Sequence, residues 1–188
     1  MSSVVVRRLA AGAVVVVGSA ALLARPWLVR LPVGPVTVLV VLFVVLGVVG
    51  AAWRLPAPDG GPRVGPLSAW LALGIGLGAF GVGRLLAAGT LPVAPLVFRS
   101  VALNTLAAVS EEAFFRRLAY GVATAWGPVL AVTTSAAVFA AVHVTVWGWA
   151  VLPLDLAAGL VLGWQRWASG RWSVPAATHA AANVLAIV

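Results

Sequence analysis

Long apolar runs, separated by short breaks at proline, glycine and arginine, make up most of this 188-residue chain. A helix that crosses a membrane needs about 20 mostly apolar residues, and about seven segments of the chain approach that length. The pattern therefore predicts an all-α fold, a polytopic bundle of about seven transmembrane helices. The predicted spans are residues 9–24, 35–53, 67–83, 98–126, 129–147, 149–166 and 172–188.

Two stretches interrupt this pattern. Residues 54–66 (RLPAPDGGPRVGP) are rich in proline and glycine and predict an exposed loop. Residues 85–98 are apolar but contain two prolines and a glycine, which indicates a connection or a re-entrant segment. No proline interrupts residues 98–126, so one long helix is expected there. Because no internal repeat is visible, we treat residues 1–188 as a single integral membrane domain.

The composition excludes an ordinary water-soluble domain. Hydrophobic residues make up 63% of the chain and charged residues 9%, whereas soluble domains are about a quarter charged. The net charge of +8 comes from arginines that are dispersed beside apolar runs, which is typical of membrane flanks and not of a nucleic-acid surface. Most of the nine tryptophans stand near predicted span ends, as in an interfacial belt. We therefore expect the lipid bilayer as a partner, and no nucleic acid.

Half of the four acidic residues stand side by side in an apolar segment, as Glu111 and Glu112. A carboxylate at the centre of a membrane helix costs about 2.5–3.5 kcal/mol on insertion scales, so such residues face a cavity, pair with a cation or do chemistry. Both histidines of the chain also lie in predicted spans. Besides the glutamates and the neighbouring arginines, the strong polar groups at membrane depth are Asn104, His143, Asp155, His179 and Asn183.

Helical spacing separates the two glutamates. Glu112 and Arg116 are four residues apart, so they share one helix face and can form an ion pair. Glu111 lies about 100° around the same helix and can point elsewhere. Each residue advances a helix by about 1.5 Å. Measured from the Gly-Pro turn at 127–128, Glu111 and His143 therefore lie at similar depths if their two helices are antiparallel. The spacing therefore predicts that these two side chains are level.

Each polar residue taken alone also fits a structural role. Arg116 suits a side chain that reaches a membrane interface, and Asn183 suits a hydrogen bond between helices. Asp155, which follows Pro153, suits a helix cap. Two carboxylates, two histidines and one asparagine at these spacings favour a catalytic site over packing alone.

Three short motifs in the chain resemble those of the CAAX protease and bacteriocin-processing family of intramembrane glutamic endopeptidases, which includes the Ras-converting CAAX proteases. The family patterns are EExxxR, FxxxH and HxxxN, in that order. In this sequence they read EEAFFR (111–116), FAAVH (139–143) and HAAAN (179–183). They define a motif-bearing core at residues 101–188. One departure is Arg117, where many family members have glycine.

The resemblance implies an intramembrane endopeptidase that hydrolyses a membrane-associated peptide or protein, in a multi-pass protein of a prokaryotic cell membrane. Glu111, helped by His143, would activate a water molecule as a general base. His179 and Asn183 would donate hydrogen bonds to the developing oxyanion. By the same resemblance, the residues that hold the site in shape would be Glu112, Arg116 and Phe139.

Metal catalysis is the main alternative mechanism. Two histidines and one glutamate also suit zinc with a fourth position open for water. No HExxH motif is present, and the candidate groups come from three separate predicted helices. We therefore expect a site without a cofactor, with zinc as the alternative.

Two other functions stay open. The first is a non-catalytic membrane immunity or scaffold protein, and the complete set of motifs disfavours it. The second is a proton-coupled carrier, because intramembrane glutamate and histidine sets also build proton relays. Small size and the lack of a visible inverted repeat disfavour the carrier.

Overall fold

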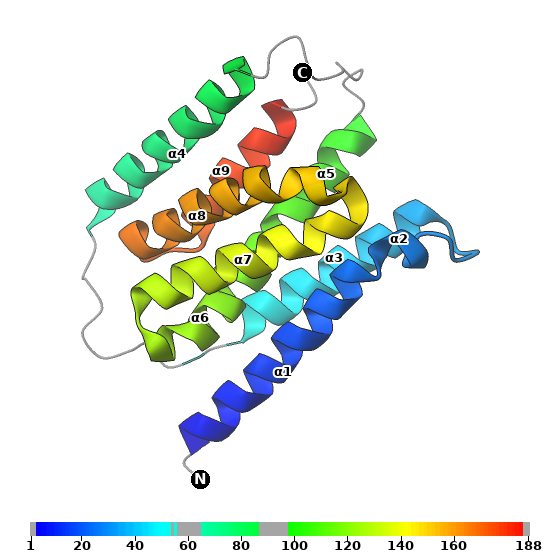
Figure 1. The fold of residues 1–188 in the computed structure, drawn as a ribbon, viewed down its shortest axis with the longest axis horizontal. Helices are drawn as coiled ribbons and strands as arrows, with labels where there is room; N and C mark the ends of the chain where they lie inside the picture. The colour runs from blue at the N-terminus through cyan, green and yellow to red at the C-terminus, as the bar shows by residue number, and fades with distance from the viewer. Residues whose placement is uncertain (1–2, 54, 56–64, 87–97, 186–188) are drawn as a thin grey trace.

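The computed structural model describes residues 3–53, 55, 65–86 and 98–185 of the chain. In chain order the elements are α1 (Ser3–Leu23), α2 (Arg25–Leu28), α3 (Pro35–Ala52), α4 (Pro66–Leu86), α5 (Phe98–Glu112), η1 (Ala113–Ala119), α6 (Tyr120–Ala123), η2 (Thr124–Trp126), α7 (Pro128–Trp147), η3 (Trp149–Val151), α8 (Leu152–Ser169) and α9 (Ser173–Leu185). Within the described ranges every element is a helix, so the all-α prediction is confirmed (Figure 1). The predicted loop at 54–66 and the connection at 85–98 lie mostly outside the described residues.

Proline and glycine set the helix boundaries, as the sequence pattern indicates. Helices α2, α3, α7 and α8 each have proline in the first two positions, where its missing N–H breaks no helical hydrogen bond. Gly127 and Gly148 precede α7 and η3 with φ angles of 97° and 80°, a backbone region that favours glycine.

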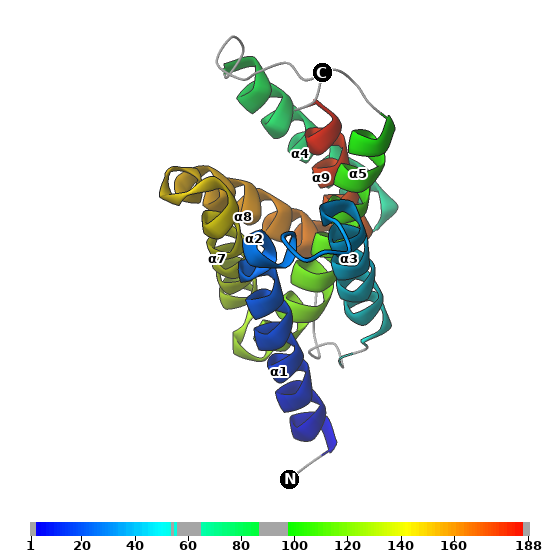
Figure 2. The same cartoon turned by 90° about the vertical axis from the view of Figure 1, so that its right-hand side faces the viewer.

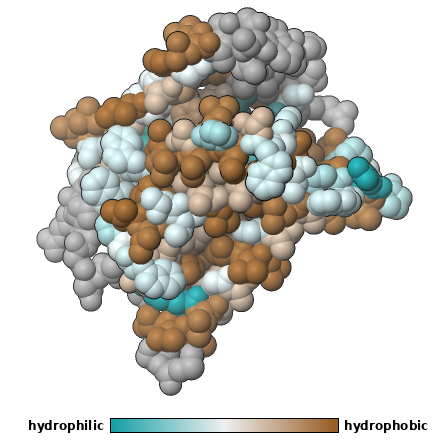
Figure 3. Space-filling model, in the orientation of Figure 1, coloured by the Kyte–Doolittle hydropathy of each residue, from teal (hydrophilic) through white to brown (hydrophobic). Residues whose placement is uncertain are grey.

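Four helices in the described part of the chain are long and apolar enough to cross a membrane. They are α1, α3, most of α4 (Leu67–Leu86) and α7. Large apolar side chains such as Val17, Leu67 and Val129 are exposed on their outer faces. Figure 3 shows apolar residues over much of one face of the molecule, as expected for a surface covered by lipid. The other three predicted spans are mostly helical where the structure describes them, but these helices do not meet this length and hydropathy criterion.

The predicted long helix at residues 98–126 is helical over its whole length but is not one regular α-helix. It begins as α5, continues as a seven-residue π-helix (η1), and ends as a short α-helix and a 3₁₀ turn. The prediction of one continuous helix is corrected on this point. Short π-helical segments often occur at functional sites, and this one begins directly after Glu111 and Glu112.

The α5–η1 segment lies in the middle of the bundle. Helix α3 packs along α5 and η1, α9 packs along α5, and α7 and α8 pack side by side. Helix α4 packs mainly on α8 and α9, and the two views agree in placing it away from the start of α1 (Figures 1 and 2).

Small residues bring neighbouring helices into backbone contact with η1. A Cβ atom on Gly50 of α3 would lie 2.5 Å from the backbone of Ala113, and one on Gly18 of α1 would lie 2.5 Å from the Phe114 ring. Such close approach is how membrane helices gain packing energy without a hydrophobic driving force. The segment that carries the two glutamates and Arg116 is therefore held from two sides.

Candidate active site

Each of the three motifs contributes residues to the lining of one cavity of about 540 Å³. Side chains from α2, α4, α5, α7, α8 and α9 line it. All four predicted catalytic residues are among them: Glu111, His143, His179 and Asn183. The apolar part of the lining includes Phe80 of α4 and Val161 of α8. The cavity thus combines a few polar groups with apolar walls, which is the usual character of a small-ligand or substrate site.

Glu111 and His143 face each other, as their predicted depths required. The Oε1 atom of Glu111 lies 3.9 Å from the Nε2 atom of His143. This distance is too long for a direct hydrogen bond and suits a bridging water molecule. The other ring nitrogen, Nδ1, lies 2.8 Å from the backbone carbonyl oxygen of Phe139. Because a carbonyl only accepts, we assign the hydrogen of the neutral ring to Nδ1, which leaves a lone pair on Nε2 toward Glu111.

Glu112 contacts the other histidine, His179. Its Oε1 atom lies 3.0 Å from Nδ1 of His179, and its Oε2 atom lies 3.4 Å from Nε of Arg116. The Glu112 and Arg116 side chains are completely buried. The predicted ion pair between them is confirmed, and the contact with His179 is an addition that motif spacing does not reveal.

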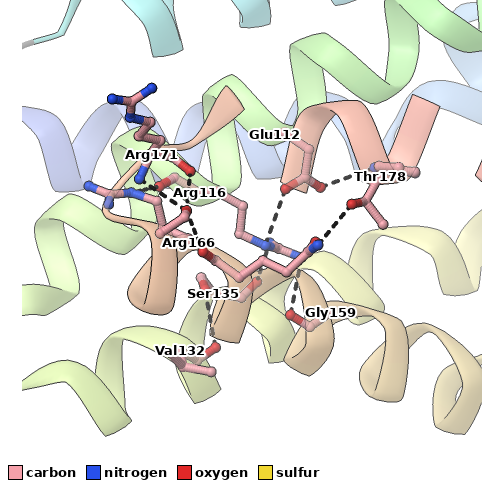
Figure 4. A network of polar contacts seen from close by, with 11 residues as sticks. Glu112, Arg116, Val132, Ser135, Gly159, Arg166, Arg171 and Thr178 are labelled. Carbon is pink, nitrogen blue, oxygen red and sulfur yellow. Dashed lines mark hydrogen bonds and ion pairs between the residues drawn. The ribbon is translucent and has the colours of Figure 1, made fainter. Parts of the chain in front are cut away.

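Arg116 connects three helices (Figure 4). Its guanidinium group donates to the backbone carbonyls of Ser135 in α7, at 3.5 Å, and Gly159 in α8, at 3.3 Å. Its own carbonyl accepts a hydrogen bond of 3.0 Å from Arg166. A buried charge is tolerated when it is paired and hydrogen-bonded in this way. Arg116 therefore fixes α7 and α8 against the π-helical segment.

Phe139 stands between the functional groups. Its ring centroid lies 4.7 Å from that of His143 and 5.6 Å from that of His179. The guanidinium carbon of Arg116 lies 4.9 Å from the same ring, within cation–π range. The Phe139 side chain thus contacts both histidines, and the orienting role that the motif implies stays a prediction.

Asn183 links α9 to α5. Its side-chain amide donates a 3.2 Å hydrogen bond to the backbone carbonyl of Asn104. The sequence left such a structural role open as an alternative to catalysis. An amide nitrogen carries two hydrogens, so this bond leaves one for a second acceptor on the cavity side.

Sequence reasoning missed two further contacts at the site, both made by residues outside the motifs. The Nη1 atom of Arg25, in α2, lies 3.8 Å from Oε1 of Glu111, whereas the sequence indicated only a membrane-flank charge. The Oδ2 atom of Asp155 lies 3.7 Å from Nδ1 of His143. The expected cap is corrected, because Asp155 lies inside the first turn of α8 and the N-cap residue is Val151, which makes no side-chain cap bond. The rarity of acidic residues was the one signal that pointed to Asp155.

Within the described ranges, no group of three or more histidine and acidic side chains has the arrangement of a metal site. The geometry gives the reason, because the two imidazoles belong to separate pairs. His143 faces Glu111, and His179 faces Glu112. A zinc site would instead need both imidazoles and a carboxylate around one point.

Comparison with known protein families gives one match. The model of the family described as type II CAAX prenyl endopeptidase Rce1-like matches residues 92–185, half of the chain. No curated protein and no solved structure matches the chain. The matched range contains all three motifs and Asp155, whereas Arg25 lies outside it.

We predict that Arg116→Ala strongly lowers the stability of the purified protein in detergent. The change leaves the buried Glu112 carboxylate without its cation, which typically costs about 3–5 kcal/mol. Thermal unfolding and the yield of monodisperse protein measure the effect. Arg30→Ala is the matched control, because Arg30 is exposed in the turn after α2. If both variants unfold at the temperature of the parent, the ion pair does not stabilise the bundle.

Proposed function

The chain belongs to the Rce1-like family of type II CAAX prenyl endopeptidases, and on this premise we propose that it is an intramembrane endopeptidase whose nucleophile is a water molecule activated by Glu111. Family membership makes it a membrane protease, a hydrolase of peptide bonds. One observation supports the glutamate mechanism above all. The Glu111 carboxylate and the Nε2 atom of His143 face each other 3.9 Å apart at a cavity wall.

In the proposed reaction, a water molecule lies between Glu111 and His143. Its oxygen bonds to the carbon of the scissile carbonyl, its proton passes to this pair, and the carbonyl oxygen becomes an oxyanion. The carbon–nitrogen bond then breaks as a proton is delivered to the leaving amine. A positioned general base of this kind contributes a rate factor of about 10²–10⁴.

His179 suits the oxyanion because of its contact with Glu112. Since Nδ1 donates to that carboxylate, the ring offers a hydrogen at Nε2 only when it carries both protons. An imidazolium between Glu112 and the cavity, with Arg116 behind the carboxylate, would form a buried unit of net positive charge. Fixed donors in such a shielded place stabilise a developing negative charge. The second amide hydrogen of Asn183 is the other proposed donor.

The substrate we propose is a membrane-associated peptide or protein with apolar residues beside the scissile bond. The apolar lining from α4 and α8, with Phe80 and Val161, supports such a substrate. Because the family description reads CAAX prenyl endopeptidase, a farnesylated peptide is included among the substrates to be tested.

We also propose that the three helical segments at residues 98–126, 149–166 and 172–185 cross the membrane and complete seven spans. They pack against helices that meet the criterion for a span, and each contributes a polar residue to the cavity. A helix that other helices cover can cross the membrane with a shorter apolar stretch than a helix that faces lipid.

We predict that Glu111→Gln and His143→Ala each lower the cleavage rate by about 10²–10⁴-fold, because each removes a member of the water-activating pair. The assay uses the full chain in liposomes with quenched fluorescent peptides, farnesylated and unmodified. To find natural substrates, new protein termini are identified in membranes of cells that produce the parent, and compared with those in cells that produce the Glu111→Gln variant. Val109→Ala, on the exposed side of α5, is the control that retains activity. Equal cleavage by the parent and both variants would contradict the mechanism through Glu111 and His143, and no cleavage by the parent would favour a non-catalytic protein.

The proposed water activation needs no metal. Treatment of the purified protein with EDTA or 1,10-phenanthroline should therefore leave the cleavage rate unchanged, since Glu111 supplies the base and His179 with Asn183 supplies the oxyanion donors. A loss of activity that zinc restores, and magnesium does not, would establish the metal mechanism instead.

The span count can be tested by single cysteines, because the natural chain contains none. Seven spans put Trp126 and Arg171 on one side of the membrane and Trp149 on the other. All three residues are exposed. Each is replaced by cysteine in turn and labelled in intact cells with a membrane-impermeant maleimide. Labelling of all three from the same side would contradict the proposed topology.

A further inference from the structure

Asp155 is the second acidic residue in the cavity lining, after Glu111, and it lies outside the three motifs. Its Oδ2 atom is buried, makes no hydrogen bond, and lies 3.7 Å from Nδ1 of His143. The same ring faces Glu111 through Nε2. His143 therefore stands between two carboxylates, and in this apolar protein each such group is costly to bury.

The fold brings Asp155 to His143 through close packing of α7 and α8. Gly159, one turn after Asp155, lies so near α7 that a Cβ atom there would be 3.0 Å from the Cα atom of Ala136. This approach brings the first turn of α8 alongside the end of α7 that carries His143. The contact thus depends on helix packing and not only on a flexible side chain.

We propose that Asp155 is a positioning residue that acts through His143. Its carboxylate favours the hydrogen on Nδ1, in concert with the carbonyl of Phe139, and so keeps the Nε2 lone pair toward Glu111 and the attacking water. It also stabilises the imidazolium that forms when Nε2 takes a proton. Carboxylates behind catalytic histidines hold the tautomer in this way in other hydrolases. The role in catalysis rests on the proposed endopeptidase function, whereas the pairing itself does not.

The charges around His143 are consistent with this role. Glu111 faces Nε2, Asp155 faces Nδ1, and Arg25 lies beyond Glu111 at 3.8 Å. A proton on His143 therefore creates a cation between two anions. Without Asp155, Glu111 would be the one anion among the described residues in contact with that cation, and the mechanism requires Glu111 for the water.

Asparagine at position 155 is the informative change. Its amide is nearly the same shape as the carboxylate but can donate a hydrogen to Nδ1. That bond favours the other tautomer, with the hydrogen on Nε2 and no lone pair for the water. Asp155→Glu keeps the carboxylate and should keep the tautomer.

A second role for Asp155 must be separated from the first. An acidic residue in the first turn also stabilises a helix through the helix dipole. The double variant Asp155→Asn with Leu156→Asp restores an acidic group at this helix end on an exposed position outside the cavity lining. It restores the dipole interaction and not the contact with His143.

The experiment is nitrogen-15 NMR of the full chain labelled at histidine, in detergent micelles. The chain has only two histidines, so His143→Ala assigns both ring signals. We expect the Nδ1–H tautomer for His143 in the parent and in Asp155→Glu, and a shift to Nε2–H in Asp155→Asn and in the double variant. The kcat of cleavage should fall about 10-fold or more in Asp155→Asn, with KM changed less than about 2-fold and with partial recovery in Asp155→Glu.

The outcomes distinguish the proposals. An unchanged tautomer and an unchanged kcat in Asp155→Asn overturn the positioning role, and so does recovery of both in the double variant. If the tautomer shifts while the parent protein cleaves nothing, the Asp155–His143 pairing stands and the endopeptidase proposal fails. Should Asp155→Asn not fold, Asp155→Ser provides the same comparison, because it also removes the carboxylate.

Discussion

The buried contact between Glu112 and Arg116 is the interaction on which the rest of the site depends. Both side chains are fully buried, and a charge without water is tolerated only when every neighbour compensates for it. The compensating groups come from different helices: a histidine of α9, and backbone carbonyls of α7 and α8. A shift of any of these helices would remove a hydrogen bond from one of the two buried charges. The ion pair therefore fixes the relative positions of the elements that carry the motifs.

The two neighbouring glutamates have different surroundings because one residue step turns a helix by about 100°. Glu112 points into the protein and belongs to the framework, whereas Glu111 lines the cavity and faces His143. The π-helical segment begins directly after them, and it carries Arg116 to its buried position. Of the two buried carboxylates, Glu112 thus stabilises the structure, and Glu111 remains available for the proposed chemistry.

The sequence predicted the parts of this arrangement that depend on local periodicity. Apolar runs and proline–glycine breaks located the helices, and a count of residues from one turn placed Glu111 level with His143. It did not predict the π-helical segment, whose formation depends on tertiary packing. It also gave no sign of Arg25 at Glu111, because contacts between distant segments depend on packing at small residues such as Gly50. Motif spacing cannot report such contacts.

Four ionisable side chains at the cavity form a row that runs from Arg25 through Glu111 and His143 to Asp155. In the proposed reaction, a proton from water can rest on either central residue. On Glu111 it would leave Arg25 facing a neutral partner, whereas on His143 it creates a cation between two carboxylates. In a medium of low dielectric, opposite charges at contact distance outweigh more distant ones. In the proposed reaction, Glu111 therefore takes the proton from the water as the base, and His143, which lies between two carboxylates, can receive that proton and return it to the leaving amine.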